Sequence, residues 1–183
     1  MKKYFFIIFA MFIISCNNSH ADNPLATYKG QTLCTGEEEI VFSCPIKKKT
    51  LSVCSSKELT REKGYLSYRF GKKDKIELTY PEKPAHPYGL FRFSHYLRPG
   101  GAQNMGLEYS RLTFDVKDVT YEIFETYLSF ESEDTGQLPG TYHGIDIIIP
   151  ETDTSKKTIT LNCTGEVTSK LTDLYFNLYK YDD

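Results

Sequence analysis

The stretch YLSYRFGKKDKIELTYP, residues 65–81, decides the fold class, because apolar and polar side chains alternate along both of its halves. Apolar or aromatic residues occupy every second position of residues 66–70 and again of residues 76–80. A period of two residues is typical of a β-strand with one buried face, and residues 71–75 supply the glycine and aspartate of a turn. The stretch therefore predicts a β-hairpin.

Segments of the same kind recur along the chain at regular spacing, with turn residues between them. Together with the hairpin they are residues 40–44, 50–54, 66–70, 76–80, 90–97, 107–116, 119–128, 145–149 and 158–163. Many short strands in succession indicate antiparallel pairing rather than alternating strands and helices. We therefore expect an all-β fold, an antiparallel β-sandwich or barrel of about nine strands.

Two segments depart from the strand pattern. Ser55 followed by Glu58 has the spacing of a capping box, which predicts a short helical turn after residue 55. Near the C-terminus, leucines at residues 171, 174 and 178 have helical spacing, which predicts a short closing helix. A strand over residues 174–179 is the alternative.

The N-terminus has the composition of an export signal. Lys2 and Lys3 precede an apolar run over residues 4–15. That run is shorter than the ~20 apolar residues that span a bilayer core, so we expect residues 1–15 to be a cleaved signal peptide.

Cys16 ends the apolar run, where its context resembles the lipobox of bacterial lipoproteins. The resemblance implies that Cys16 is lipidated and that residues 16–32 form a tether from the membrane to a single β domain, residues 33–183. Asn17 follows the cysteine, which by resemblance to lipoprotein sorting in enteric-type bacteria favours the outer membrane, facing the periplasm or the surface. Cleavage after Ala21, giving a soluble periplasmic protein, is the alternative.

The four remaining cysteines are even in number in an exported domain, which predicts two disulfides. In a regular hairpin of residues 40–44 and 50–54, Cys44 and Cys54 would lie roughly 13 Å apart, beyond the ~7 Å that a disulfide allows between Cα atoms. Cys34–Cys54 with Cys44–Cys163 is preferred, because Cys34 enters the hairpin where Cys54 leaves it. Cys34–Cys44 with Cys54–Cys163 stays open.

Charge and motifs exclude several classes of function. Without the signal, 24 acidic residues outnumber the basic ones, and a net charge of about −4 argues against a nucleic-acid binder. The chain has no phosphate-binding loop, dinucleotide fingerprint, nucleophile elbow, zinc-protease motif or calcium loop. We therefore predict no enzymatic activity and no cofactor. A hydrolase or metal site centred on His143 and Asp146 is the alternative.

Two acidic segments are the candidate contact surface for a protein partner. They contribute Glu37, Glu38, Glu39, Glu131, Glu133 and Asp134. Complementary charge raises the association rate and the specificity of a complex. The segments therefore suit a basic partner, such as a toxin or a cell-wall hydrolase.

The chain resembles a group of small exported bacterial proteins that have no assigned activity. The resemblance rests on residues 42–44 (FSC), 52–55 (SVCS) and 68–71 (YRFG), with Cys163 and the Thr-Gly after it. The plan of lipobox, tether and small disulfide-bearing β domain also resembles envelope lysozyme inhibitors and immunity lipoproteins. These resemblances imply a non-enzymatic envelope lipoprotein that binds a protein partner, as an inhibitor or immunity protein. A small-ligand-binding or structural envelope protein is the alternative.

Overall fold

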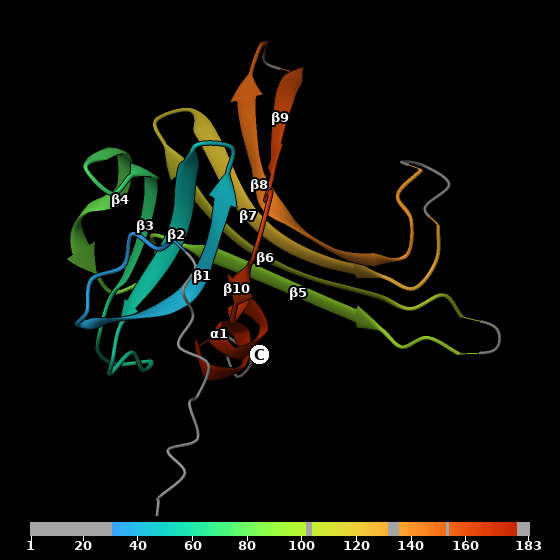
Figure 1. The fold of residues 1–183 in the computed structure, drawn as a ribbon, viewed down its shortest axis with the longest axis horizontal. Coiled ribbons are helices and arrows are strands. Elements are labelled where there is room, and N and C mark those ends of the chain that lie inside the picture. Colours follow the sequence, from blue (N-terminus) through green and yellow to red (C-terminus); the bar gives the residue numbers. More distant parts are fainter. Residues whose placement is uncertain (1–30, 102–103, 132–135, 153, 179–183) are drawn as a thin grey trace, which may run out of the picture.

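Strands dominate the computed structural model, which describes residues 31–101, 104–131, 136–152 and 154–178. The strands are β1 (Glu38–Ile46), β2 (Lys49–Ser56), β3 (Leu66–Lys72), β4 (Lys75–Ala85), β5 (Arg92–Arg98), β6 (Leu107–Val116), β7 (Val119–Leu128), β8 (Gly140–Pro150), β9 (Lys156–Asn162) and β10 (Thr168–Ser169), and the helix is α1 (Leu171–Leu178). They form two five-stranded antiparallel sheets: sheet A, in the order β10-β1-β2-β3-β4, and sheet B, in the order β5-β6-β7-β8-β9 (Figure 1). The predicted all-β fold is confirmed, with a sandwich as its architecture.

The hairpin predicted from residues 65–81 is β3 and β4. Tyr68 pairs with Tyr80 and Phe70 with Leu78, so the alternating apolar side chains share one face. β4 continues through a proline-rich segment to Ala85, beyond its predicted end. Proline is tolerated there because β4 is an edge strand of sheet A, where a missing N–H removes no bond to an outer neighbour.

Helical structure is found at one of the two predicted places. The C-terminal helix is α1, whose leucines at 171, 174 and 178 are buried. After residue 55 the chain forms a hydrogen-bonded turn, in which Leu59 N–H donates to Ser56 O over 3.2 Å, and residues 57–65 contain no helix. Ser55 belongs to β2 and is buried, so it does not cap a helix as predicted.

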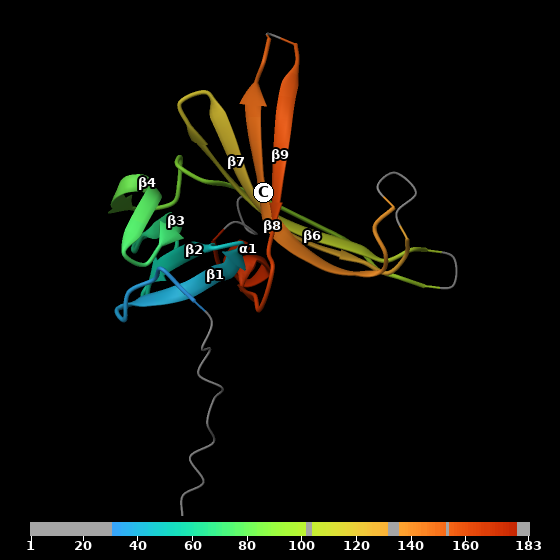
Figure 2. The same ribbon diagram turned by 45° about the horizontal axis from the view of Figure 1, so that its top comes forward.

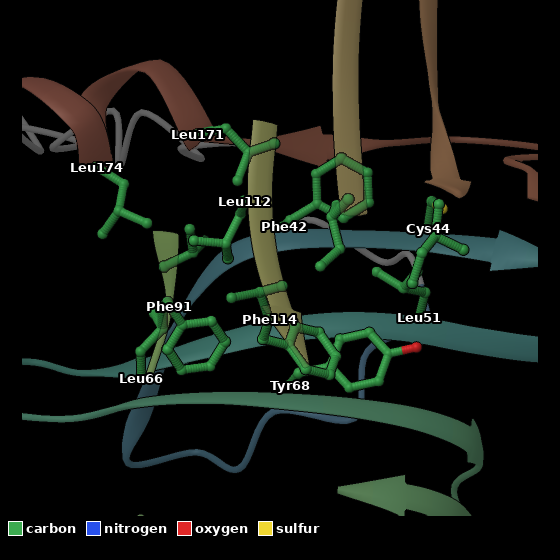
Figure 3. Close-up of a cluster of buried hydrophobic side chains, with 14 of the residues drawn as sticks. Phe42, Cys44, Leu51, Leu66, Tyr68, Phe91, Leu112, Phe114, Leu171 and Leu174 are labelled. Atoms are coloured by element: carbon green, nitrogen blue, oxygen red, sulfur yellow. The ribbon is translucent and has the colours of Figure 1, made fainter. Parts of the chain in front are cut away.

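The core lies between the two sheets and is rich in aromatic rings (Figure 3). Phe114 of sheet B packs against Tyr68 and Tyr80 of sheet A, with ring centroids 4.8 and 4.5 Å apart. The disulfide Cys44–Cys163 links β1 to the residue that follows β9. Aromatic packing and one covalent bond therefore join the sheets.

The segment before β1, residues 31–35, covers the outer face of sheet A. Leu33 N–H donates to Ser52 Oγ over 3.0 Å, and Ser43 Oγ donates to the Gln31 carbonyl over 3.1 Å. The disulfide Cys34–Cys54 fixes the segment to β2. Both disulfides have the pairing preferred from the sequence, and β1 carries a bulge between Ile40 and Phe42 without bringing Cys44 opposite Cys54.

Sheet B extends beyond the sandwich. Figures 1 and 2 both show the ends of β5, β6, β7 and β8 continuing past α1, away from sheet A. We call this part the arm and define it as residues 96–98, 107–109, 126–128 and 140–142. Within the described residues, no helix is both long enough and apolar enough to cross a bilayer.

Candidate functional site

The face of sheet B that forms the core continues along the arm. Leu112 and Phe114 of β6 are buried in the core, so by strand alternation Ser110 and Glu108 point to the same side. The tight turn Lys117-Asp118 fixes the register between β6 and β7. We call this side of sheet B the inner face.

A row of four polar side chains crosses the inner face where the sandwich ends. His95, Ser110, Glu125 and His143 are cross-strand partners on β5, β6, β7 and β8. His95 Nδ1 lies 3.1 Å from Ser110 Oγ, and His143 Nε2 lies 3.7 Å from the nearer Glu125 carboxylate oxygen. Four neighbouring strands thus place two histidines, a serine and a carboxylate side by side.

This row does not form an accessible nucleophile. Ser110 is 1% exposed, and its Oγ also lies 2.9 Å from Thr172 Oγ1 of α1. A catalytic serine must reach its substrate as well as a base, and α1 closes that approach. Burial lowers the pKa of His143, and the Glu125 carboxylate partly opposes this shift. The row therefore ends the core with two neighbouring pairs of polar groups, the hydrogen-bonded His95 and Ser110 and the adjacent Glu125 and His143.

Beyond the row, large apolar side chains on the inner face are exposed. Leu97 and Tyr127 flank Glu108 across β5, β6 and β7 and are 56% and 45% exposed. Phe176 of α1 is 39% exposed and lies beside the polar row, with its ring centroid 5.7 Å from that of His95. We define the arm surface as Leu97, Glu108, Glu125, Tyr127, Thr141 and Phe176. It combines exposed apolar groups with two carboxylates.

The outer face of the arm has a different character. Tyr96 and Tyr109 stack with centroids 5.5 Å apart, and the Arg111 guanidinium lies 5.2 Å from the Tyr109 ring centroid. Arg111 also forms an ion pair with Glu122. These side chains therefore contact one another within the sheet, through ring stacking, a cation–π contact and an ion pair.

The predicted acidic contact residues that the structure describes do not form one surface. Glu37 and Glu39 are exposed near the start of β1 in sheet A, and Glu37 pairs with Lys57 over 3.2 Å. Glu131 is exposed after β7 in sheet B. The prediction is wrong for Glu38, whose side chain is 1% exposed and bound to Arg69, so it cannot contact a partner.

Other predicted residues lie outside the part of the chain that the structure describes. They are Cys16, Ala21, Glu133 and Asp134, with the signal peptide 1–15 and all but the last two residues of the tether 16–32. Lipidation and the sorting of the chain therefore stay predictions.

The pairing of His143 with Asp146 is wrong. The two residues are three apart on β8, so they point to opposite faces of sheet B. Asp146 accepts a hydrogen bond from Thr160 Oγ1 over 2.6 Å, whereas His143 faces Glu125. In the described parts of the chain, no three or more His, Cys, Asp or Glu side chains are grouped so that they could hold a metal ion.

Comparison with known proteins found no matching family model, no matching curated protein and no matching solved structure. The resemblance to small exported proteins and to envelope inhibitors therefore stays a prediction.

Sequence reasoning missed the arm surface, although the sequence contains a signal for it. The predicted strands 107–116 and 119–128 are twice as long as the predicted strands 40–44 and 50–54. A long sheet packed on a shorter one must leave part of one face uncovered. That face carries Leu97 and Tyr127 at the alternating positions beyond the core.

Proposed function

We propose that this protein is a non-enzymatic lipoprotein of the bacterial cell envelope that binds a basic protein through the arm surface. The observation that carries the proposal is the exposure of Leu97 and Tyr127 on the inner face of sheet B, together with that of Phe176 on α1, beyond the part of this face that forms the core. In the simplest form of this proposal, the partner is a toxin or a cell-wall hydrolase, which the protein inhibits. Cys16 would carry the lipid anchor at the outer membrane.

Apolar exposure supports a protein interface because contiguous apolar patches on a soluble domain mark interaction sites. Tyrosine is among the residues that contribute most at protein interfaces, where a partner pocket excludes water around the ring. Strands of a continuous sheet hold Leu97 and Tyr127 in place before binding. Little conformational entropy is then lost on association.

The charge of the arm surface favours a basic partner. Glu108 lies between Leu97 and Tyr127 in the same cross-strand row, and Glu125 lies in the row behind it. Glu131 follows β7 at the end of the arm. Carboxylates beside apolar groups attract lysine and arginine and repel acidic competitors.

A matched pair of tyrosines tests this proposal. Tyr127 on the inner face and Tyr96 on the outer face are 45% and 42% exposed, and both belong to the arm. A photo-crosslinking amino acid at position 127 of the full chain, expressed in its host envelope, should capture one basic protein. The same amino acid at position 96 should not.

Binding measurements with the captured protein complete the test. Tyr127→Ala should weaken its affinity tenfold or more, as expected of an interface anchor, and Tyr96→Ala should change it less than twofold. Equal crosslinking at both positions, or capture of lipid or glycan alone, would contradict the proposed interface.

A further inference from the structure

Six lysines gather at one end of sheet A. The turns between β1 and β2 and between β3 and β4 lie at the same end, because Thr50 of β2 pairs with Gly71 of β3. We define the lysine end as Lys47, Lys48, Lys49, Lys72, Lys73 and Lys75. All but Lys49 are exposed. Two neighbouring hairpins thus present their basic residues together.

The local charge is strongly positive, in contrast to the acidic chain as a whole. Residues 46–50 and 71–77 contain the six lysines and two carboxylates, Asp74 and Glu77, which leaves a local net charge of +4. Lys49 forms an ion pair with one of these carboxylates, with its Nζ 2.5 Å from Glu77 Oε2. The lysine end is therefore suited to a polyanionic surface.

Apolar groups lie among these lysines. Ile46, Phe70 and Leu161 line a shallow cleft together with residues 47–49. Lys49 Nζ lies 5.3 Å from the Phe70 ring centroid, and Ile76 on the adjacent strand is exposed. Lysines around apolar side chains match the boundary between lipid headgroups and acyl chains, where apolar groups insert and ammonium groups meet phosphates.

The chain also enters the domain at this end. Thr50 Oγ1 donates to Gln31 Oε1 over 3.3 Å, and Gln31 lines a second cleft with Lys48, Lys72 and Lys73. Only fifteen residues along the chain separate Cys16 from Gln31, so the distance between them cannot exceed roughly 50 Å. A lipid on Cys16 would therefore keep the lysine end within this distance of the membrane, a step that rests on the proposed function.

We propose that the lysine end binds anionic phospholipid headgroups on the membrane to which the chain is anchored. Each lysine close to an anionic surface strengthens binding by about fivefold, and the attraction fades beyond a Debye length of ~8 Å at physiological salt. The surface would hold the domain in one orientation, with its lysine end toward the lipid. The arm surface belongs to the other sheet and stays available to a partner.

Vesicle binding by a chain without lipid tests this proposal. The mature chain, residues 16–183 with Cys16→Ser, should bind vesicles of phosphatidylglycerol and phosphatidylcholine and not vesicles of phosphatidylcholine alone. Replacing Lys48, Lys72 and Lys73 together by Glu should lower the partition coefficient by about 100-fold or more, because it removes three positive charges and adds three negative ones. Added salt should release the unsubstituted chain.

A triple variant with the same change in charge is the control. Lys57, Lys63 and Lys83 lie at the opposite end of sheet A and are exposed, and Lys57→Glu, Lys63→Glu and Lys83→Glu together should retain most of the binding. Circular dichroism checks that both triple variants fold. Equal loss in the two variants, or absent binding by the unsubstituted chain, would overturn the proposal.

Two further readouts separate this proposal from the others. Mass spectrometry of the native protein reports whether Cys16 carries lipid, and its outcome does not affect vesicle binding by the Cys16→Ser chain. A crosslinker at Lys73 that captures an acidic protein, combined with absent vesicle binding, would assign the lysine end to a protein partner and overturn the lipid proposal.

Discussion

At the scale of single residues, Glu38 shows how position changes the role of a charge. Its carboxylate accepts hydrogen bonds from both terminal nitrogens of Arg69, at 2.6 and 2.8 Å, from Thr35 N–H and from the Tyr65 hydroxyl. Burial alone would raise the pKa of Glu38. The hydrogen bonds from Arg69 and Thr35 together outweigh burial and lower the pKa to about 2. Glu38, which the sequence analysis placed on the surface, therefore forms a buried ion pair with Arg69 in the folded protein.

This ion pair predicts a specific loss of stability in acid. Because the folded state lowers the pKa from 4.5 to about 2, the stabilisation is complete above pH 4.5 and is lost as the pH falls toward 2. The shift corresponds to about 3 kcal/mol of unfolding free energy. Glu38→Gln should therefore be less stable by about this amount at pH 7 and little different at pH 2.

Urea unfolding of both proteins across this pH range measures the difference. Glu37→Gln is the control, because Glu37 is exposed and its pairing with Lys57 is a surface contact of small value. A difference between wild type and Glu38→Gln that does not change with pH would contradict the ion-pair explanation.

The sequence could not assign Glu38 to this role. Three consecutive glutamates look alike in sequence, and the partner of the middle one is 31 residues away on β3. The alternation along β1 does place neighbouring side chains on opposite faces, but which face segment 31–35 covers depends on tertiary contacts. Identity and spacing alone therefore left Glu38 among the surface residues.

At the scale of elements, the alternation of apolar residues and the positions of the cysteines predicted most of the fold. The predicted bounds of β6 and β7 agree with the structure, because both segments are rich in β-branched and aromatic residues and a two-residue turn joins them. β10 was missed because a strand of two residues has no periodicity. Hairpin geometry argued only against Cys44–Cys54, since Cys54 lies opposite Ile40 and not opposite Cys44. The structure confirms the preferred one of the two pairings that this left open.

The two disulfides should differ in their contribution to stability. Cys44–Cys163 closes a chain separation of 119 residues and Cys34–Cys54 one of 20. The chain-entropy relation gives roughly 5 kcal/mol for the longer loop and roughly 3 kcal/mol for the shorter one. Replacing Cys44 and Cys163 by Ser should therefore destabilise the protein more than replacing Cys34 and Cys54.

Chemical denaturation of the two double variants tests this ranking. Hydrogen exchange adds a spatial readout, because loss of Cys34–Cys54 should expose Leu33 N–H while the amides of sheet B stay protected. Equal destabilisation of the two variants would show that native contacts, and not loop closure, set the values.

At the scale of the whole molecule, the mismatch between the two sheets is the feature that local patterns do not reveal. Sequence alternation shows which side chains share a face, but not how far the opposite sheet reaches over it. Leu112 and Leu97 illustrate this, because both are leucines on the inner face and only Leu112 is covered. Coverage depends on contacts between segments far apart in the chain.

These two leucines predict opposite consequences of substitution. Leu112→Ala should cost about 3 kcal/mol of unfolding free energy, since it leaves a cavity between the sheets. Leu97→Ser should change stability by no more than about 0.5 kcal/mol. It should nonetheless weaken partner binding, which would separate the two roles in one pair of measurements. A large loss of stability in Leu97→Ser would mean that the arm surface is packed.

The two disulfides also define how the molecule would carry mechanical load. A pull on the segment before Gln31 passes from Cys34 to Cys54 on β2, and from Cys44 on β1 through Cys163 to the end of β9. Covalent bonds therefore lead from the N-terminal segment into both sheets, without relying on the hydrogen bonds of residues 31–35. If the domain were tethered at its N-terminus and bound to a partner through its arm, the two disulfides would carry the tension between these points. Reduction of the disulfides would leave residues 31–35 held to sheet A by hydrogen bonds, which break one after another under load.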